Sequence, residues 1–162
     1  MIFLSVGTQE PFDRLVRAVD GWAATASMPV FGQLGGLTPS SFRPVHMEWA
    51  QFIPADVYEA KLATCRLMVA HAGMGSIISA LTHMKPLLML PRRASLGEHR
   101  NDHQLATAEK FADRPGLHVA ADETQIPALI DRLLAAPDPQ GATLDAQASP
   151  ELLAAVRSFI HG

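Results

Sequence analysis

A short glycine-bearing segment carries the residue types best suited to chemistry. Residues 67–70 (Leu-Met-Val-Ala) are apolar enough for a buried strand, and the small-residue turn 71–75 (His-Ala-Gly-Met-Gly) follows. Ser76 is placed to cap a helix that runs through Leu81. Because such a helix start presents free backbone N–H groups and glycines let a ligand approach the backbone, the turn predicts a diphosphate site.

This turn differs from two known phosphate-binding motifs. A dinucleotide fingerprint needs a third glycine where this chain has Ile78, and the lysine of a P-loop is absent. His71 lies at the mouth of the turn. Its imidazole either stabilises negative charge on a diphosphate leaving group or is a half-buried group bonded to the backbone, and the sequence favours neither.

A second polar segment separates an apolar run at 86–90 from an amphipathic helix at 102–112. Residues 92–104 (Arg-Arg-Ala-Ser-Leu-Gly-Glu-His-Arg-Asn-Asp-His-Gln) are dense in hydrogen-bonding side chains. A loop this polar between two regular elements is typical of a binding site, although a solvated surface loop has the same composition. Of its two histidines, His99 and His103, we expect His103 to face a ligand.

Apolar runs and helical periodicity alternate along the chain. Strands are predicted at 2–6, 30–31, 45–52, 67–70, 86–90 and 117–120, and helices at 12–22, 57–64, 76–81, 102–112 and 126–134. Leu105, Ala108 and Phe111 form the inward face of the helix at 102–112. The alternation predicts an α/β fold, a Rossmann-like parallel sheet with helices on both faces. Ligands bind such sheets at the carboxyl ends of the strands, which here gather the loops at 7–11, 52–56, 71–76 and 91–104.

Composition excludes several classes of protein. A chain of 162 residues with 48% hydrophobic residues suits one folded domain, and a net charge of −3 without a basic stripe argues against nucleic acid. Cys65 is single and has no metal-ligand spacing, so a buried structural thiol is expected. No signal peptide or membrane span is predicted, which makes the expected location cytoplasmic.

Residues 137–162 differ in composition from what precedes them. Residues 1–136 are predicted to form the folded domain, and 137–149, rich in Pro, Gly, Ala and Asp, a flexible linker. Residues 150–162 repeat an apolar helical stripe. This last helix either docks on a partner or packs against its own sheet.

Three motifs together resemble a known family. "HAGMGS" and "NDHQ", bridged by "KPLLMLPR", are similar to the C-terminal, donor-binding half of glycosyltransferase family 28. That family has the GT-B fold, in which two Rossmann-like domains face each other across a cleft. "VGTQEPFDRLV" and "RRASLGEHRNDHQLATA" look most like the single-domain, PssE-type subunits of split bacterial exopolysaccharide glucuronosyltransferases. The catalytic subunit of the dolichol-linked UDP-GlcNAc transferase is similar as well. The resemblance covers about residues 1–135.

The resemblance implies roles for individual residues. UDP binding falls to residues of three loops: Gly7, Thr8, Phe52, Ile53, Gly73, Met74, Gly75 and Ser76. Phe52 and Ile53 match the segment that meets the uracil edge. Asp102 and Gln104 resemble an acid-and-amide pair that holds sugar hydroxyls, with His103 between them. Where many members carry a ribose-binding glutamate, this chain has Ser79, so its ribose recognition is expected to be weaker or shared.

Arginines near "NDHQ" bear on the identity of the sugar. Three arginines lie near that motif: Arg92, Arg93 and Arg100. Together they carry more positive charge than the binding of a neutral hexose needs. Because guanidinium groups pair with carboxylates through two hydrogen bonds, we expect Arg92 and Arg93 to bind glucuronic acid. The alternatives are that these arginines bind the diphosphate, a partner chain or anionic lipid head groups.

The resemblance implies a half-enzyme. A GT-B enzyme needs a second domain for the acceptor and, in this family, for the general base, and 162 residues leave no room for it. We therefore expect a UDP-sugar-dependent, inverting transferase subunit that works with a membrane-anchored partner on a lipid-linked saccharide acceptor, peripheral to the inner face of the membrane. No metal or cofactor is expected. The alternatives are a UDP-GlcNAc or UDP-glucose transferase subunit and a non-catalytic nucleotide-binding module.

Overall fold

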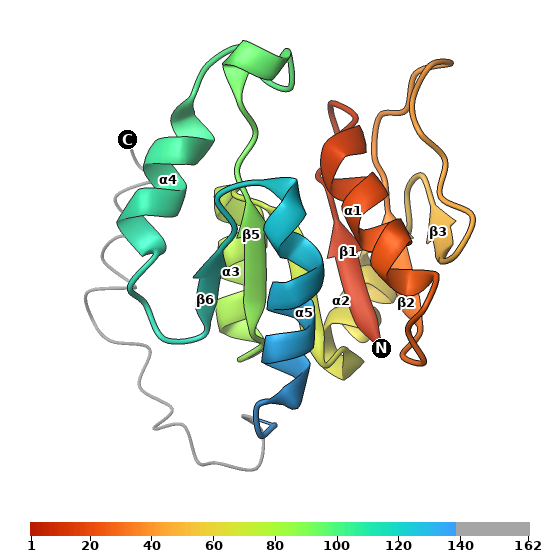
Figure 1. The fold of residues 1–162 in the computed structure, drawn as a ribbon, viewed down its shortest axis with the longest axis vertical. Coiled ribbons are helices and arrows are strands. Elements are labelled where there is room, and N and C mark those ends of the chain that lie inside the picture. Colours follow the sequence, from red (N-terminus) through yellow and green to blue (C-terminus); the bar gives the residue numbers. More distant parts are fainter. Residues whose placement is uncertain (139–162) are drawn as a thin grey trace.

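Six short segments form one parallel sheet in the computed structural model, which describes residues 1–138 (Figure 1). They are β1 (Ile2–Ser5), β2 (Val30–Gln33), β3 (Glu48–Ala50), β4 (Leu67–His71), β5 (Leu87–Leu90) and β6 (Leu117–Val119). Every neighbouring pair is parallel, in the order β3-β2-β1-β4-β5-β6. The strand order changes direction between β1 and β4, and sheets of this type bind ligands at that switch point.

Helices cover both faces of the sheet. They are α1 (Asp13–Ala23), α2 (Ala55–Thr64), α3 (Met74–Thr82), α4 (His103–Phe111) and α5 (Ile126–Ala135), with short 3-10 turns at Ala94–Leu96 and Glu123–Gln125. In Figure 1, α1 and α5 lie in front of the sheet and α2 and α3 behind it. The predicted α/β fold with a parallel sheet is therefore confirmed.

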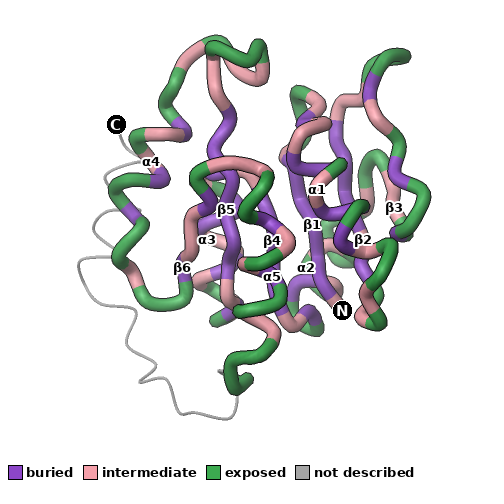
Figure 2. The backbone as a smooth tube through the Cα atoms, viewed as in Figure 1, coloured by how far each residue is buried: buried purple, intermediate pink, exposed green. Residues whose placement is uncertain are grey.

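Side chains of the central strands point alternately to the two faces of the sheet, and each face has its own apolar core. Ile2 and Leu4 pack with α1 and α5, whereas Phe3 between them packs with α2, α3 and α4. The four inner strands, β2, β1, β4 and β5, are the most buried parts of the tube in Figure 2. Because both faces are covered, the functional groups can gather only at the strand ends and in the loops.

Two predicted elements differ in detail. The strand expected at 45–52 is only Glu48–Ala50, because the amides of Val45 and His46 donate to the buried Asp20 carboxylate (3.1 and 2.7 Å) instead of to a neighbouring strand. In α4 the buried residues are Gln104, Ala108 and Phe111, and Leu105 is only partly buried.

Several smaller expectations are also settled. Cys65 is a buried free thiol whose Sγ donates to the Leu62 carbonyl at 3.2 Å, as predicted. Within residues 1–138 no helix is long and apolar enough to cross a membrane. The predicted linker at 137–149 falls almost wholly, and the predicted helix at 150–162 entirely, outside the described residues.

Candidate functional site

A small pocket lies at the carboxyl ends of β1, β4 and β5, beside the switch point. Its volume is about 270 Å³, and its walls come from three separate loops: Val6, Gly7, Thr8, Gln9, Glu10, His71, Arg92, His99 and Gln104. A larger hollow of about 790 Å³ lies between α1 and α5, near Trp22 and Asp131. It opens at the opposite edge of the sheet, so the smaller pocket is the candidate site.

The His71 imidazole forms the centre of this pocket, between two glycines. A Cβ atom on Gly7 would lie 3.2 Å from the ring, and a Cβ atom on Gly73 would overlap Nε2. Gly7 also has a φ of +87°, a left-handed conformation that glycine adopts most easily. The two glycines are therefore needed for the imidazole itself, not only for a ligand.

Burial lowers the pKa of His71 to about 4, and the nearby positive charge of Arg92 adds to the shift. The ligand-free protein therefore holds a neutral imidazole at neutral pH. An interaction with the Ser5 backbone partly opposes the pKa shift, and the buried Nδ1 atom has no partner at normal hydrogen-bond geometry within residues 1–138. A neutral ring can still donate one hydrogen bond to a ligand.

Helix α3 begins at Met74, one residue after Gly73, the first glycine of the predicted turn. Gly73 is the N-cap, and the first amide bonded within the helix is that of Ile77, to the Gly73 carbonyl at 3.2 Å. The amides of residues 74–76 precede it and have no acceptor in the described part of the chain. Ser76 lies in the first turn and does not cap the helix, which corrects the prediction. A Cβ atom on Gly75 would meet only open space.

Arg92 ties two loops together through its guanidinium group. Nη1 donates to the carbonyls of Pro11 (2.7 Å) and Glu98 (3.2 Å), and Nη2 to those of Val6 and Glu10 (both 2.7 Å). The residue is 3% exposed. Four of its five N–H groups donate to the protein, which leaves only Nε–H for a ligand. Arg92 lines the pocket, but these bonds disfavour the predicted two-pronged pairing with a sugar carboxylate.

Gly35 and Gly36, which were not among the predicted site residues, lie against the loop at 7–9. A Cβ atom on Gly35 would overlap the Gly7 carbonyl oxygen, and one on Gly36 would overlap that of Gln9. Two consecutive glycines indicate a place where the backbone is closely approached, but their contact with residues 7–9 could not be predicted from the local sequence.

The "NDHQ" motif contributes to the pocket through one residue. Gln104 is buried and its Oε1 accepts the Arg92 amide at 3.1 Å, leaving its NH₂ group for other partners. Asp102 accepts the Ala94 amide at 2.9 Å. His103 is exposed at the start of α4, whereas His99 lines the pocket. The preference for His103 is therefore corrected: His99 is the histidine that faces the pocket.

The other two arginines have different surroundings. Nη2 of Arg93 donates to the Ala121 carbonyl at 2.6 Å, while its Nε is buried without a partner within residues 1–138. Arg100 is exposed, and no hydrogen bond or ion pair involves its side chain in that range. Both retain several guanidinium N–H groups for a ligand, whereas Arg92 retains one.

The predicted base-binding segment lies farther along the same edge of the sheet. The Ile53 amide donates to Oε1 of Gln33 at 3.1 Å, so the side chain of a buried strand residue fixes this segment. The Phe52 side chain is 55% exposed directly before it. An exposed aromatic ring beside fixed backbone groups offers both a stacking surface and hydrogen bonds.

Unpartnered polar atoms concentrate around the pocket. Within residues 1–138, the buried side-chain nitrogens without partners are His71 Nδ1, His99 Nδ1 and Arg93 Nε. Buried polar groups are normally paired, so unpaired ones at a pocket indicate a missing polar ligand. Two of the three belong to residues that line the pocket. The described residues contain no group of three side chains that could hold a metal ion.

Comparison with known proteins agrees with this architecture. Residues 1–157 match the glycosyltransferase family 28 C-terminal domain. A search of curated proteins found no match.

Solved structures of glycosyltransferases have a similar fold. CalG4, the calicheamicin glycosyltransferase, aligns with a TM-score of 0.66 and 20% identity, over 97% of this chain and 39% of that one. SnogD from Streptomyces nogalater (TM-score 0.57, 19% identity) covers 99% of this chain and 42% of that one. VinC, solved in complex with dTDP, aligns with a TM-score of 0.57 and 19% identity, over 99% of this chain and 40% of that one. The chain spans less than half the length of these proteins, and its fold is that of the C-terminal half of GT-B glycosyltransferases, as predicted.

Proposed function

The chain belongs to the glycosyltransferase family 28 C-terminal domain family, and from this premise we propose that it binds the nucleotide-sugar donor of a two-chain glycosyltransferase. The observation that carries the proposal is the pocket at the switch point. There, the buried imidazole of His71 has an unpartnered nitrogen and lies against Gly73, the N-cap of α3, and the first amides of that helix have no partner in the described residues. This combination suits a diphosphate, which needs hydrogen-bond donors and a favourable helix dipole.

We propose that the diphosphate binds the backbone of Gly73, Met74, Gly75 and Ser76. His71 donates a hydrogen bond to it, and Gly7 and Thr8 form the opposite wall. Because Arg92 and burial disfavour the charged imidazole, a bound diphosphate raises the pKa of His71 by supplying the missing negative charge. The imidazole thereby stabilises charge that develops on the leaving group during transfer.

The base is proposed to be uracil, held at Phe52 and Ile53. The exposed Phe52 ring and the segment fixed by Gln33 support a flat heterocycle there. VinC was solved with another pyrimidine nucleoside diphosphate, dTDP, which is consistent with this choice. Ser79, which stands where many relatives have a ribose-binding glutamate, leaves ribose recognition to be shared with other groups.

The sugar is proposed to lie near Asp102, Gln104 and His99, with glucuronic acid favoured. Arg92 no longer supports that choice, because the protein uses its donors. Arg93 and Arg100 support it, since both retain guanidinium N–H groups that can pair with a carboxylate.

Transfer is proposed to be an inverting single displacement at the anomeric carbon. The acceptor hydroxyl forms the new bond, the bond to the diphosphate breaks, and UDP leaves with the electron pair. The general base comes from a membrane-anchored partner of the PssD type, which presents a lipid-linked saccharide in exopolysaccharide synthesis and holds this chain at the membrane.

Two measurements test the proposal. Calorimetry with UDP, UDP-glucuronate, UDP-GlcNAc and UDP-glucose should give the highest affinity for UDP-glucuronate. Arg93→Gln or Arg100→Gln should weaken that binding about 10- to 150-fold, the value of one charge-assisted pair, and leave UDP nearly unchanged. Equal affinities for UDP-glucose and UDP-glucuronate would remove the glucuronate assignment.

Transfer to a lipid-linked acceptor should require the partner chain. Robust transfer by this chain alone would contradict the two-chain arrangement. Nucleotide binding without transfer in the presence of the partner would favour a non-catalytic module.

A further inference from the structure

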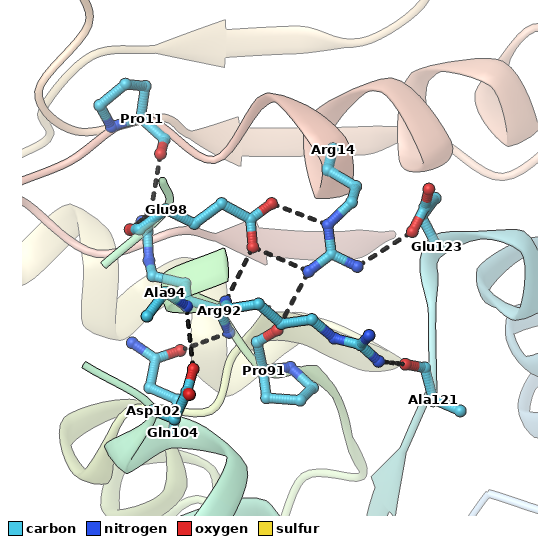
Figure 3. A network of polar contacts seen from close by, with 11 residues as sticks. Pro11, Arg14, Pro91, Arg92, Ala94, Glu98, Asp102, Gln104, Ala121 and Glu123 are labelled. Atoms are coloured by element: carbon cyan, nitrogen blue, oxygen red, sulfur yellow. Dashed lines mark hydrogen bonds and ion pairs between the residues drawn. The ribbon is translucent and has the colours of Figure 1, made fainter. Parts of the chain in front are cut away.

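Arg14, on the first turn of α1, is tied to the loop that carries one wall of the pocket (Figure 3). Its Nε and Nη2 donate to the two carboxylate oxygens of Glu98, at 2.7 and 2.8 Å. Nη1 donates to Glu123 at 2.9 Å, and Nη2 also donates to the Pro91 carbonyl at 3.1 Å. One side chain therefore joins α1 to the residue after β5, to the loop that continues from it and to the 3-10 turn before α5.

The contact is a shielded, two-pronged ion pair. Both side chains, Arg14 and Glu98, are only 12% exposed. Hydrogen bonds to Glu98 raise the pKa of Arg14, and Glu123 adds to the effect. A partly buried, bidentate guanidinium–carboxylate pair is both stronger and more directional than an exposed ion pair.

Glu98 transmits this constraint to the pocket in two ways. Its Oε2 also accepts the amide of Arg93 at 3.0 Å, which closes the loop on itself. Its carbonyl accepts Nη1 of Arg92, the residue that also binds the carbonyls of the loop at 6–11. The next residue along the chain is His99, which lines the pocket.

The loop has little regular structure, and side-chain hydrogen bonds of Glu98, Arg92, Arg93 and Asp102 fix it. Between β5 and α4 its regular structure is one 3-10 turn at Ala94–Leu96. A segment of this kind stays in one conformation only when specific contacts offset its conformational entropy.

We infer that Arg14 is a positioning residue: through Glu98 it fixes the loop at 92–102, so that His99 and Arg92 are held at the pocket before the ligand arrives. Arg14 contacts no ligand in this account. The inference rests on the proposed function for the identity of the ligand, but the ordering of the loop is independent of it.

Hydrogen exchange and UDP-glucuronate calorimetry on the full chain test this inference. Arg14→Gln should speed amide exchange about tenfold or more in peptides covering 92–102, leave β1 and β4 protected, and weaken UDP-glucuronate binding about 10- to 100-fold, as expected when a binding group is misplaced. Arg14→Lys, which keeps the charge but loses the two-pronged geometry, should give a smaller effect of the same kind. Arg17→Gln, an exposed arginine on the same helix, is the matched control and should change neither quantity.

The pairing itself is tested by a double-mutant cycle. Glu98→Gln should resemble Arg14→Gln, and the double variant should be little worse than either, because both changes break one interaction. Unchanged exchange at 92–102 in Arg14→Gln, or fully additive effects, would overturn the inference. Should Arg14→Gln fail to fold, Arg14→Lys and Glu98→Gln carry the same test. Absence of UDP binding in the wild type would refute the proposed function, and the exchange data would still decide the role of Arg14.

Discussion

Two neighbouring segments at the carboxyl edge of the sheet form the pocket by different means. The turn at 71–76 is short, and main-chain geometry shapes it: Gly73 leaves room for the His71 ring, and the chain passes directly into α3. The loop at 92–102 is longer and is shaped by side chains. Arg92, Glu98 and Asp102 bond to main-chain groups within it and around it.

The difference concerns what each segment tolerates. A turn fixed by sterics fails when atoms are added, since close-packed neighbours cannot move away cheaply. A loop fixed by charges and hydrogen bonds fails when a donor is removed, because the acceptors left behind stay buried and unpaired. The following substitutions separate the two cases.

The largest effect on stability is expected in the charged loop, at Arg92. Arg92→Met leaves four carbonyl groups without their donor and should lower the free energy of unfolding by about 3–5 kcal/mol. Arg93→Met, its sequence neighbour, removes one side-chain hydrogen bond and should cost about 1 kcal/mol. Urea unfolding measures both. Equal costs would mean that Arg92 does not hold the loops together.

An intermediate effect is expected in the glycine turn. Gly73→Ala forces a Cβ atom into the His71 ring and should cost about 1–3 kcal/mol. Gly75→Ala, two residues on, meets open space and should leave stability unchanged or raise it slightly. The same urea experiment applies, and a tolerated Gly73→Ala would show that the imidazole is not confined as described.

Near neutral pH, the smallest effect on stability is the response of the turn to acid. The pKa of His71 is about 4 in the folded chain and 6.5 in the reference state, so the unfolded chain binds the proton more readily. Stability from this group is complete above about pH 7 and falls as the pH drops toward 4, by about 0.8 kcal/mol between pH 7.5 and 6.

Replacement of His71 isolates that contribution. His71→Asn should flatten the dependence of the unfolding free energy on pH over this range. His118→Asn is the control. Burial also lowers the pKa of His118, but that side chain lies on β6, outside the pocket lining. This variant should therefore keep the part of the pH dependence of unfolding that is due to His71. An unchanged pH profile in His71→Asn would refute the buried neutral imidazole.

The same difference explains what could be predicted from the sequence. The strands, the helices and the turn at 71–76 follow from local periodicity and from glycines near one another in the chain. The contacts of the loop at 92–104 could not be predicted in this way, because its partners are remote in the sequence: Glu98 lies 84 residues from Arg14, and Glu10 lies 82 from Arg92. Arginines in a polar segment were therefore interpreted as ligand contacts, although one of them supports the main chain.

The start of α4 explains why His99 lines the pocket and the predicted His103 does not. The prediction relied on the motif that contains His103, but α4 begins at that residue and exposes it. Gly35 and Gly36 were missed for a similar reason, since their close approach to residues 7–9 depends on the pairing of β1 with β2. Local patterns located the edge of the sheet where the pocket lies, whereas three-dimensional contacts decide which side chains line it.

The central claim is that the turn at 73–76 holds the diphosphate of the donor, and UDP calorimetry on one variant tests it most directly. Gly75→Val adds a branched side chain at a position where a Cβ atom would meet no protein atom within 4 Å. The account predicts that the wild type binds UDP and that Gly75→Val, with unchanged circular dichroism and unfolding midpoint, does not. A folded Gly75→Val variant that binds UDP as tightly as the wild type would contradict the account.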